Sequence, residues 1–333
     1  MPRNGTTVPL MAGDAAAAIS RFGVAPRTHA VPVLEVGATE DAWKAARRKG
    51  IGASEASVLC GVSPNNSRFS MWWQKFNGWD IDSTREMWLG TRLEPIIREV
   101  FLDEFPQVQV FRPGAALWRH PDHEFMLCTP DFLAVFPDDP KVVVPIECKS
   151  DQTSKGWGKS GTAEVPPHHR IQAVVQALVF GAPLAYVAHL NGKKFTWHPI
   201  VPTPDECHVW WPKLVKDARQ FVVSLETGLP PDIDAVDGHK ATAEMLERLY
   251  AGVDEALPPA VVDVELAEEY ITLRGQLRDL KERYAKVQNR IRYEMGNSLL
   301  AITPHGDEVA KRSIGKSDGW TVPPHTQDRL LPR

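Results

Sequence analysis

Apolar residues recur at helical spacing through the first part of the chain. This spacing predicts helices over residues 40–48, 53–59 and 69–76 and a longer one over 85–105. Pro95 lies inside the longest run and predicts a kink or a new helix start there, because proline lacks the backbone N–H that a helix interior uses.

The pattern then changes to short runs rich in Val and Phe, separated by Pro, Asp and Gly, as is typical of strands. Strands are predicted over residues 108–111, 115–118, 125–127, 132–136, 142–148, 184–190 and 195–200, and helices over 166–180 and 205–227. This order predicts an α+β (mixed α/β) fold with a central mixed sheet flanked by helices.

Four segments are predicted. Residues 1–38 are rich in Ala, Pro and Gly and are interpreted as a flexible leader, 39–228 as the main domain and 229–262 as an irregular linker. The extension over 263–333 contains a predicted helix, followed by a hairpin around His305-Gly306-Asp307.

The helix of the extension has apolar residues at alternating spacings of four and three, which is the heptad pattern of a coiled coil. These residues are Leu266, Tyr270, Leu273, Leu277, Leu280, Tyr284, Val287 and Ile291. The helix either docks on its own domain or forms an arm that contacts DNA or another subunit. Asp263 is the expected N-cap and Gly296 the expected stop.

Composition narrows the class of protein. The chain has 333 residues, a formal net charge of −4 and 43% hydrophobic residues, which excludes a fibrous or low-complexity protein. No apolar run is long enough to span a membrane, and no secretory signal pattern is present, so no membrane association is expected. Four cysteines without a CxxC pair exclude the common zinc ribbons and favour a reduced, cytoplasmic protein.

Two carboxylates and a lysine lie at the ends of predicted strands. Asp131 starts one strand, and Glu147 and Lys149 share one face near the end of the next, so a hairpin would bring Asp131 toward Glu147. Carboxylate oxygens suit Mg²⁺ or Mn²⁺, and the lysine can orient a water or stabilise charge on a phosphate. This pattern favours metal-assisted hydrolysis.

A plainer interpretation is a solvated Asp in a turn and a salt-bridged Glu–Lys pair. Two features weigh against it. The apolar run 142–146 is typical of a buried strand, where charges are costly unless they are paired or bound to metal. A third acid, Glu94, lies on a largely apolar predicted helix.

A second candidate site follows the first predicted helix. Gly50, Gly52 and Ala53 permit close backbone approach, a helix start offers free N–H groups to an anion, and Arg47 supplies a bidentate donor for phosphate. A plain helix cap is the alternative. Residues 43–98 hold nine Lys and Arg against five acids, which favours local DNA binding.

Aromatic residues divide into two groups. Most tryptophans of the predicted helices are expected in the core, whereas Trp157, in a polar loop over residues 154–161, is the better candidate for a DNA contact. His168 and His169 are expected at a helix start.

Five motifs in order resemble the YqaJ-like viral recombinases. These are phage exonucleases similar to lambda exonuclease, within the PD-(D/E)xK nuclease superfamily. The motifs are RKGIGASEA at 48–56, WLGTRLEP at 88–95, TPD at 129–131, ECK at 147–149 and Gln172 in a predicted helix. Related nucleases often have Tyr where this chain has Gln176.

The resemblance implies roles for individual residues and a PD-(D/E)xK core. Asp131, Glu147 and the Cys148 backbone carbonyl would bind a metal ion, and Glu94 would help to bind a second one. Lys149 would act on the nucleophilic water, and Gln172 would support Lys149 or the scissile phosphate. Arg47, Ser54 and Thr129 would form the pocket for a 5′-phosphate.

The expected function is therefore a Mg²⁺-dependent exonuclease. The family implies processive 5′-to-3′ digestion of one strand of linear double-stranded DNA to mononucleotides, a partner single-strand annealing protein for phage-type recombination, and a ring-shaped homotrimer. Alternatives are an endonuclease of the same superfamily in restriction or repair, an iron–sulfur nuclease, whose cysteine pattern this chain lacks, and a catalytically silent DNA-end-binding module. A phage-encoded protein would act in the host cytoplasm.

Overall fold

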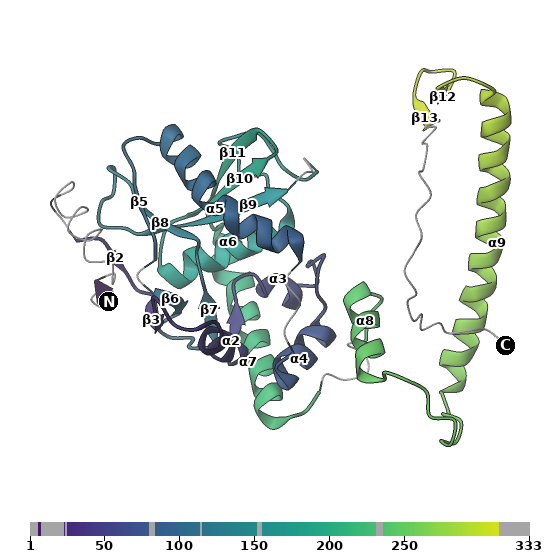
Figure 1. Cartoon of the computed structure of the whole chain (residues 1–333), viewed down its shortest axis with the longest axis horizontal. Coiled ribbons are helices and arrows are strands. Elements are labelled where there is room, and N and C mark those ends of the chain that lie inside the picture. The colour runs from purple at the N-terminus through teal and green to yellow at the C-terminus, as the bar shows by residue number, and fades with distance from the viewer. Residues whose placement is uncertain are drawn as a thin grey trace. The chain divides into compact units, whose positions relative to one another are not determined.

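The computed structural model describes residues 6–7, 23, 25–79, 84–113, 115–151, 155–230 and 236–312. The chain divides into two compact units, Met1–Leu249 and Tyr250–Arg333, which are described separately below. The first unit contains both sheets that position the candidate site (Figure 1).

A five-stranded mixed sheet lies at the centre of the first unit. Its order is β11 (Lys194–Ile200), β10 (Ala185–Asn191), β9 (Val144–Asp151), β8 (Phe132–Val135) and β5 (Gln109–Phe111). Strands β9 and β10 are parallel, and the other neighbours are antiparallel. The predicted pairing of β8 with β9 is confirmed, with Phe132 opposite Ile146.

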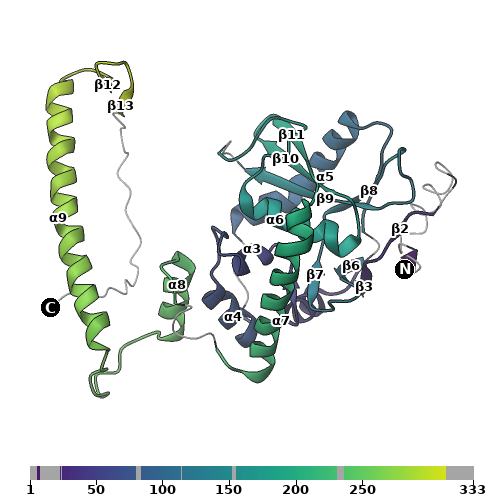
Figure 2. The same ribbon diagram turned by 180° about the vertical axis from the view of Figure 1, so that it is seen from behind.

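Two helices cover opposite faces of this sheet (Figures 1 and 2). On one face, Ile97 and Phe101 of α5 (Arg85–Glu104) pack with Ile146 and Cys148 of β9. On the other, α6 (Pro167–Phe180) packs its apolar residues against Ala185 and Val187. Because strand side chains alternate between faces, Glu147 lies on the α6 side. The predicted α+β fold, with a mixed sheet flanked by helices, is confirmed.

A second, four-stranded sheet adjoins the first. Its order is β3 (Val31–Glu35), β6 (Ala115–Arg119), β7 (Met126–Cys128) and β4 (Ile51–Gly52). Strand β4 is parallel to β7, with Gly52 opposite Leu127. The chain leaves β7 and enters β8 after only three residues, so the loop that follows β4 lies close to Asp131.

The remaining helices of the first unit complete its core. They are α2 (Glu40–Arg48), α3 (Ala56–Leu59), α4 (Arg68–Asn77), the π-helical turn η1 (Glu206–Trp210), α7 (Trp211–Thr227) and α8 (Lys240–Leu249). Trp72, Trp118, Phe180 and Phe221 are almost fully buried in the largest apolar cluster. The expected core role is thus confirmed for Trp72, whereas Trp88 is 53% exposed.

Two segments, the predicted leader and the predicted linker, contain more structure than the sequence predicts. Within the predicted leader 1–38, β1 (Thr6–Thr7) pairs with β2 (Arg27–Thr28), and β3 pairs with β6. The buried Ala30 and the hydroxyl of Thr28, which donates to the Phe180 carbonyl at 2.7 Å, hold this segment. Within the predicted linker 229–262, helix α8 buries Thr242 and Met245 and contacts α4.

Helix α5 continues through Pro95 without a new start. Pro95 and Thr91, whose carbonyl loses its usual N–H partner, are both exposed, so water can satisfy that oxygen. On the opposite side of the helix, the buried Ile97 and Phe101 keep the next turns on the sheet.

The second unit consists of a long helix and a hairpin. Helix α9 (Val264–Met295) has Asp263 as its N-cap and Gly296 at its C-terminus, as predicted, and buries none of its residues. Strands β12 (Leu300–Ile302) and β13 (Glu308–Lys311) form the predicted hairpin at its end. Among the described residues, no helix is both long and apolar enough to cross a membrane.

Candidate active site

One cavity of about 660 Å³ in the first unit brings together nearly all of the predicted site residues. Its walls come from helix α2 and the loop after β4, from α5 and α6, and from the adjoining ends of β7, β8 and β9. The predicted residues that line it are Arg47, Ser54, Glu94, Thr129, Asp131, Glu147, Cys148, Lys149 and Gln172. Residues far apart in sequence therefore form one site.

Glu147 is buried and accepts hydrogen bonds on both carboxylate oxygens. Lys149 Nζ and Gln172 Nε2 each donate to Oε1 at 2.6 Å, and Gln176 Nε2 donates to Oε2 at 2.6 Å. Lys149 shares the face of Glu147 on β9, as the strand pattern predicts, and both glutamines lie one turn apart on α6. These three donors fix the orientation of the Glu147 carboxylate.

Asp131 and Glu94 complete an acidic wall. Asp131 Oδ2 accepts a hydrogen bond from the Cys148 N–H at 2.7 Å, which ties the start of β8 to β9. Burial, followed by the charges of Glu147 and Glu94, raises the pKa of Asp131 well above its usual range. Burial and Glu147 likewise raise the pKa of Glu94. Both pKa shifts show that the acids disfavour one another's ionised form, which a bound cation would stabilise.

Lys149 is the cation of this wall. Burial alone would lower the pKa of Lys149, but the Glu147 and Asp131 carboxylates outweigh burial and raise it. Lys149 therefore stays protonated and offsets one of three acids.

The acidic wall fits a hard divalent cation by its donor chemistry. Asp131, Glu147 and Glu94 supply carboxylate oxygens, and Gln176 adds a buried amide oxygen without a hydrogen-bond partner. In the arrangement seen here, the described residues contain no group of three or more His, Cys, Asp or Glu side chains placed to hold an ion. Glu147 would have to release one of its present donors when an ion binds.

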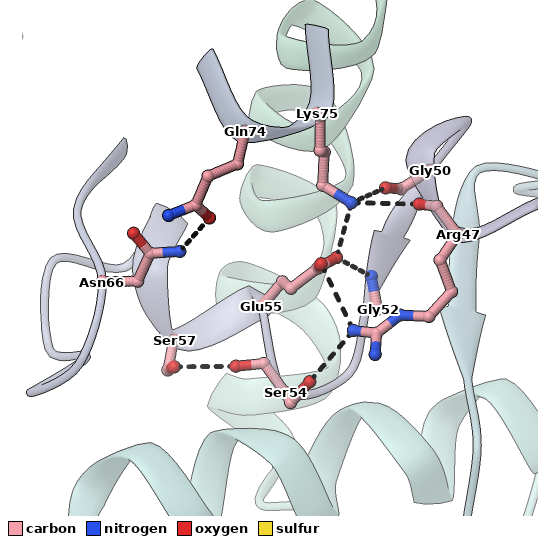
Figure 3. A network of polar contacts seen from close by, with 9 residues as sticks. All are labelled: Arg47, Gly50, Gly52, Ser54, Glu55, Ser57, Asn66, Gln74 and Lys75. Atoms are coloured by element: carbon pink, nitrogen blue, oxygen red, sulfur yellow. Dashed lines mark hydrogen bonds and ion pairs between the residues drawn. The ribbon is translucent and has the colours of Figure 1, made fainter. Parts of the chain in front are cut away.

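The opposite wall is basic and comes from the C-terminal end of helix α2 and the loop after β4. Arg47 Nη2 lies 3.3 Å from Ser54 Oγ, to which it donates, and 3.2 Å from Glu55 Oε1 (Figure 3). A side chain at Gly52 would meet this guanidinium at 2.7 Å, and one at Gly50 would meet the Phe125 carbonyl at 2.5 Å. These two glycines thus allow close packing within the protein, and the approach of an anion to their backbone stays a prediction.

Trp157 does not line this cavity. Its ring stacks on His189 with centroids 3.6 Å apart, and its Nε1 donates to Asp151 Oδ2 at 3.0 Å. His168 and His169 lie in the first turn of α6, as predicted, and burial followed by Lys149 lowers the pKa of His169 to about 2.

Three contributors to the site were not assigned roles from the sequence. Glu55 and Lys75 form an ion pair of 2.9 Å behind Arg47, and Gln176 holds Glu147. Glu55 lies inside the RKGIGASEA motif at 48–56. Gln176 stands where related nucleases often have Tyr, so the family pattern suggests no role for it. Nothing in the sequence around Lys75, apart from its charge, indicates a role in the site.

Comparison with known proteins finds one family model that matches this region. Residues 42–183 match the family described as the YqaJ-like viral recombinase domain. This part of the chain is therefore similar to that domain. The matched residues include the whole acidic wall as well as Arg47 and Ser54. A similar protein is Uncharacterized protein YqaJ of Bacillus subtilis (strain 168), 26% identical over 264 residues, which cover 77% of this chain and 78% of the relative.

Solved structures resemble this chain only distantly. An alkaline exonuclease (LHK-Exo) from Laribacter hongkongensis is 18% identical with a TM-score of 0.43, and LHK-Exo in complex with dAMP is 20% identical with a TM-score of 0.45. Each comparison covers 63% of this chain and 98% of the other. SSO0001 is 13% identical with a TM-score of 0.35, over 55% of this chain and 85% of that one.

Proposed function

We propose that this protein is a metal-dependent deoxyribonuclease that digests one strand of linear double-stranded DNA from its 5′ end. The observation that carries the proposal is a single cavity with an excess of carboxylates on one wall and Arg47 on the other. A divalent cation matches the first wall, and a DNA phosphate matches the second.

Asp131, Glu147 and the Cys148 carbonyl would hold Mg²⁺ or Mn²⁺, with Glu94 contributing to a second ion. When bound, the metal would polarise the scissile phosphate and lower the pKa of a coordinated water. Lys149 Nζ, held 2.6 Å from Glu147, would orient the attacking water or offset charge on the phosphate. Gln172 would keep the Glu147 carboxylate aligned with Lys149.

Arg47, Ser54 and Thr129 would bind the terminal 5′-phosphate. All three line the same cavity as the acids, so an end anchored there would place a neighbouring phosphodiester near the acidic wall. This arrangement supports 5′-to-3′ digestion, with Trp157 as a DNA contact outside the cavity.

The wider role proposed here is recombination. Digestion would expose a 3′ single strand, on which a single-strand annealing protein would load in the cytoplasm of the host cell. The description of the matched family as a viral recombinase domain supports this role. A homotrimer around the DNA is the assembly that the family resemblance favours.

The test compares linear duplex DNA labelled at the 5′ or 3′ end with closed circular duplex, each with Mg²⁺ or EDTA. We expect early, Mg²⁺-dependent loss of the 5′ label from linear DNA only, and none with Glu147→Ala. Cleavage of the closed circle would instead indicate an endonuclease. Binding without turnover in Mg²⁺ or Mn²⁺ would indicate an end-binding module.

A further inference from the structure

A half-buried carboxylate lies behind the basic wall. Glu55 Oε2 accepts from the Gly52 N–H at 2.7 Å and lies 2.9 Å from Lys75 Nζ, while Oε1 lies 3.2 Å from Arg47 Nη2 (Figure 3). The side chain is 22% exposed, and both oxygens have donors. Glu55 therefore connects the loop after β4, helix α2 and helix α4 at one point.

Lys75 of α4 ties down the turn between α2 and β4. Its side chain is 6% exposed, and its Nζ donates to the carbonyls of Arg47 at 3.0 Å and Gly50 at 2.9 Å as well as pairing with Glu55. Three acceptors satisfy all three ammonium protons. The ammonium group is thus fully used within the protein and is not available to a ligand.

Arg47 is held on three sides. Its guanidinium lies over the Trp43 ring at 4.7 Å, donates to Ser54 and pairs with Glu55. An arginine has five N–H donors, and the two contacts above both use Nη2. The guanidinium is therefore fixed in place while retaining donors for a ligand in the cavity.

We propose that Glu55 is a positioning residue that sets the preference of this site for a phosphorylated 5′ end, by holding the Arg47 guanidinium toward the cavity with Lys75 as its counter-charge. The inference rests on the proposed function and deepens it. Affinity for an anion then depends on the orientation of Arg47 and not on total charge, because charge-assisted hydrogen bonds require aligned donors.

A positioning role and a counter-charge role for Glu55 predict opposite effects of Glu55→Gln on phosphate binding. Removing a negative charge beside Arg47 would tighten phosphate binding if Glu55 were only a counter-charge. If Glu55 positions Arg47, the same change weakens binding, because a neutral amide cannot accept from all three of its present donors. A purely structural role would change both kinds of DNA end equally.

The test measures binding of hairpin duplex DNA with a 5′-phosphate or a 5′-hydroxyl to the full chain in EDTA, by fluorescence anisotropy. The wild-type protein is expected to bind the phosphorylated end about tenfold more tightly, the size of one charge-assisted contact. In Glu55→Gln this ratio is expected to fall to about one. The matched control is Glu40→Gln, a 77% exposed carboxylate paired with Lys44 on α2, which makes the same charge change and should keep the ratio.

An unchanged or larger ratio in folded Glu55→Gln overturns the inference. If that variant does not fold, Glu55→Asp carries the same test, since it keeps the charge but withdraws the carboxylate by one methylene; an unchanged ratio there also overturns it. A wild-type ratio of one would remove the 5′-phosphate pocket and this inference together. It would leave metal-dependent hydrolysis at the acidic wall untouched, so the two failures are distinguishable.

Discussion

The two walls of the cavity treat buried carboxylates in opposite ways. On the acidic wall, burial and neighbouring acids together raise the pKa of Asp131. On the basic wall, burial would also raise the pKa of Glu55, but Lys75, Arg47 and the Gly52 N–H outweigh it and lower the pKa. Burial acts in the same direction on both, so the sign of the surrounding charge decides the outcome. On the acidic wall one cation, Lys149, faces three acids, whereas Glu55 alone has two cations, Lys75 and Arg47.

The largest effect is expected when an acid of the acidic wall is removed, because the metal ion would lose a ligand. Asp131→Ala is expected to reduce cleavage at saturating Mg²⁺ about a thousandfold or more, because a lost metal ligand removes several kcal/mol of transition-state stabilisation. DNA binding in EDTA should survive, since one repulsive charge is gone. Single-turnover digestion measures the effect, and Glu99→Ala, an exposed acid on α5, is the control. Cleavage near the wild-type rate would remove Asp131 from the site.

Removing Arg47, the cation that faces the cavity from the basic wall, tests the phosphate pocket. Arg47→Ala is expected to raise KM for 5′-phosphorylated ends about tenfold to a hundredfold and to affect 5′-hydroxyl ends much less, because only the phosphate loses a charged donor. Steady-state digestion of the two substrates gives the ratio, with Lys44→Ala on the same helix as the control. Equal slowing of both ends would contradict a phosphate pocket.

Removing a hydrogen bond to Glu147 is expected to have a smaller effect, on the stability of the fold. Gln176→Leu leaves Glu147 Oε2 without its donor inside the protein, which is expected to lower the free energy of unfolding by about 1–3 kcal/mol in EDTA. Urea denaturation measures this loss. The exposed Gln107→Leu should cost almost nothing, and equal stabilities of the two variants would show that the Gln176 contact is not formed.

Much of the acidic wall could be predicted from the sequence, because local rules place its members. Strand alternation puts Glu147 and Lys149 on one face, and a short hairpin brings Asp131 to β9. The support for the basic wall could not be predicted. Lys75 reaches the carbonyls of Arg47 and Gly50 only through the packing of α4, and nothing in its own segment encodes that contact.

Two further differences between the sequence prediction and the structure, in residues 31–35 and in α9, have a similar cause. Residues 31–35 are short and contain Pro32, so they give a weak strand signal, yet β6 provides a partner. In α9 the heptad pattern correctly predicts the helix and its ends, but the apolar residues of the seam have no partner among the described residues of that unit that would bury them. The spacing of apolar residues thus predicts that a helix or strand forms, but not which other element packs against it.

A buried histidine outside both walls, His120, tests the effect of burial where the one neighbouring acid, Asp122, has the smallest influence on its pKa. His120 Nδ1 accepts from the Asp122 N–H at 3.1 Å, and burial, then His123 and His29, lower the pKa of His120 to about 4. The unfolded chain therefore binds more protons between pH 6.5 and pH 4, so stability falls as pH falls through this range.

His120→Asn keeps an acceptor but cannot titrate. It should reduce the loss of stability between pH 7 and pH 5 by about 1–2 kcal/mol, measured by urea denaturation at each pH. The exposed His208→Asn should leave the loss unchanged. An identical pH dependence in all three proteins would contradict the assignment to His120.

The central claim, that the acidic wall holds a divalent cation, is tested most directly by Mn²⁺ binding without DNA. Electron paramagnetic resonance of free Mn²⁺ would be recorded during titration of wild-type protein, Asp131→Asn and the control Glu99→Gln. We expect saturable binding to the wild type and the control, and binding to Asp131→Asn weakened by about tenfold or more. Equal binding by all three proteins, or none by the wild type, would contradict the account.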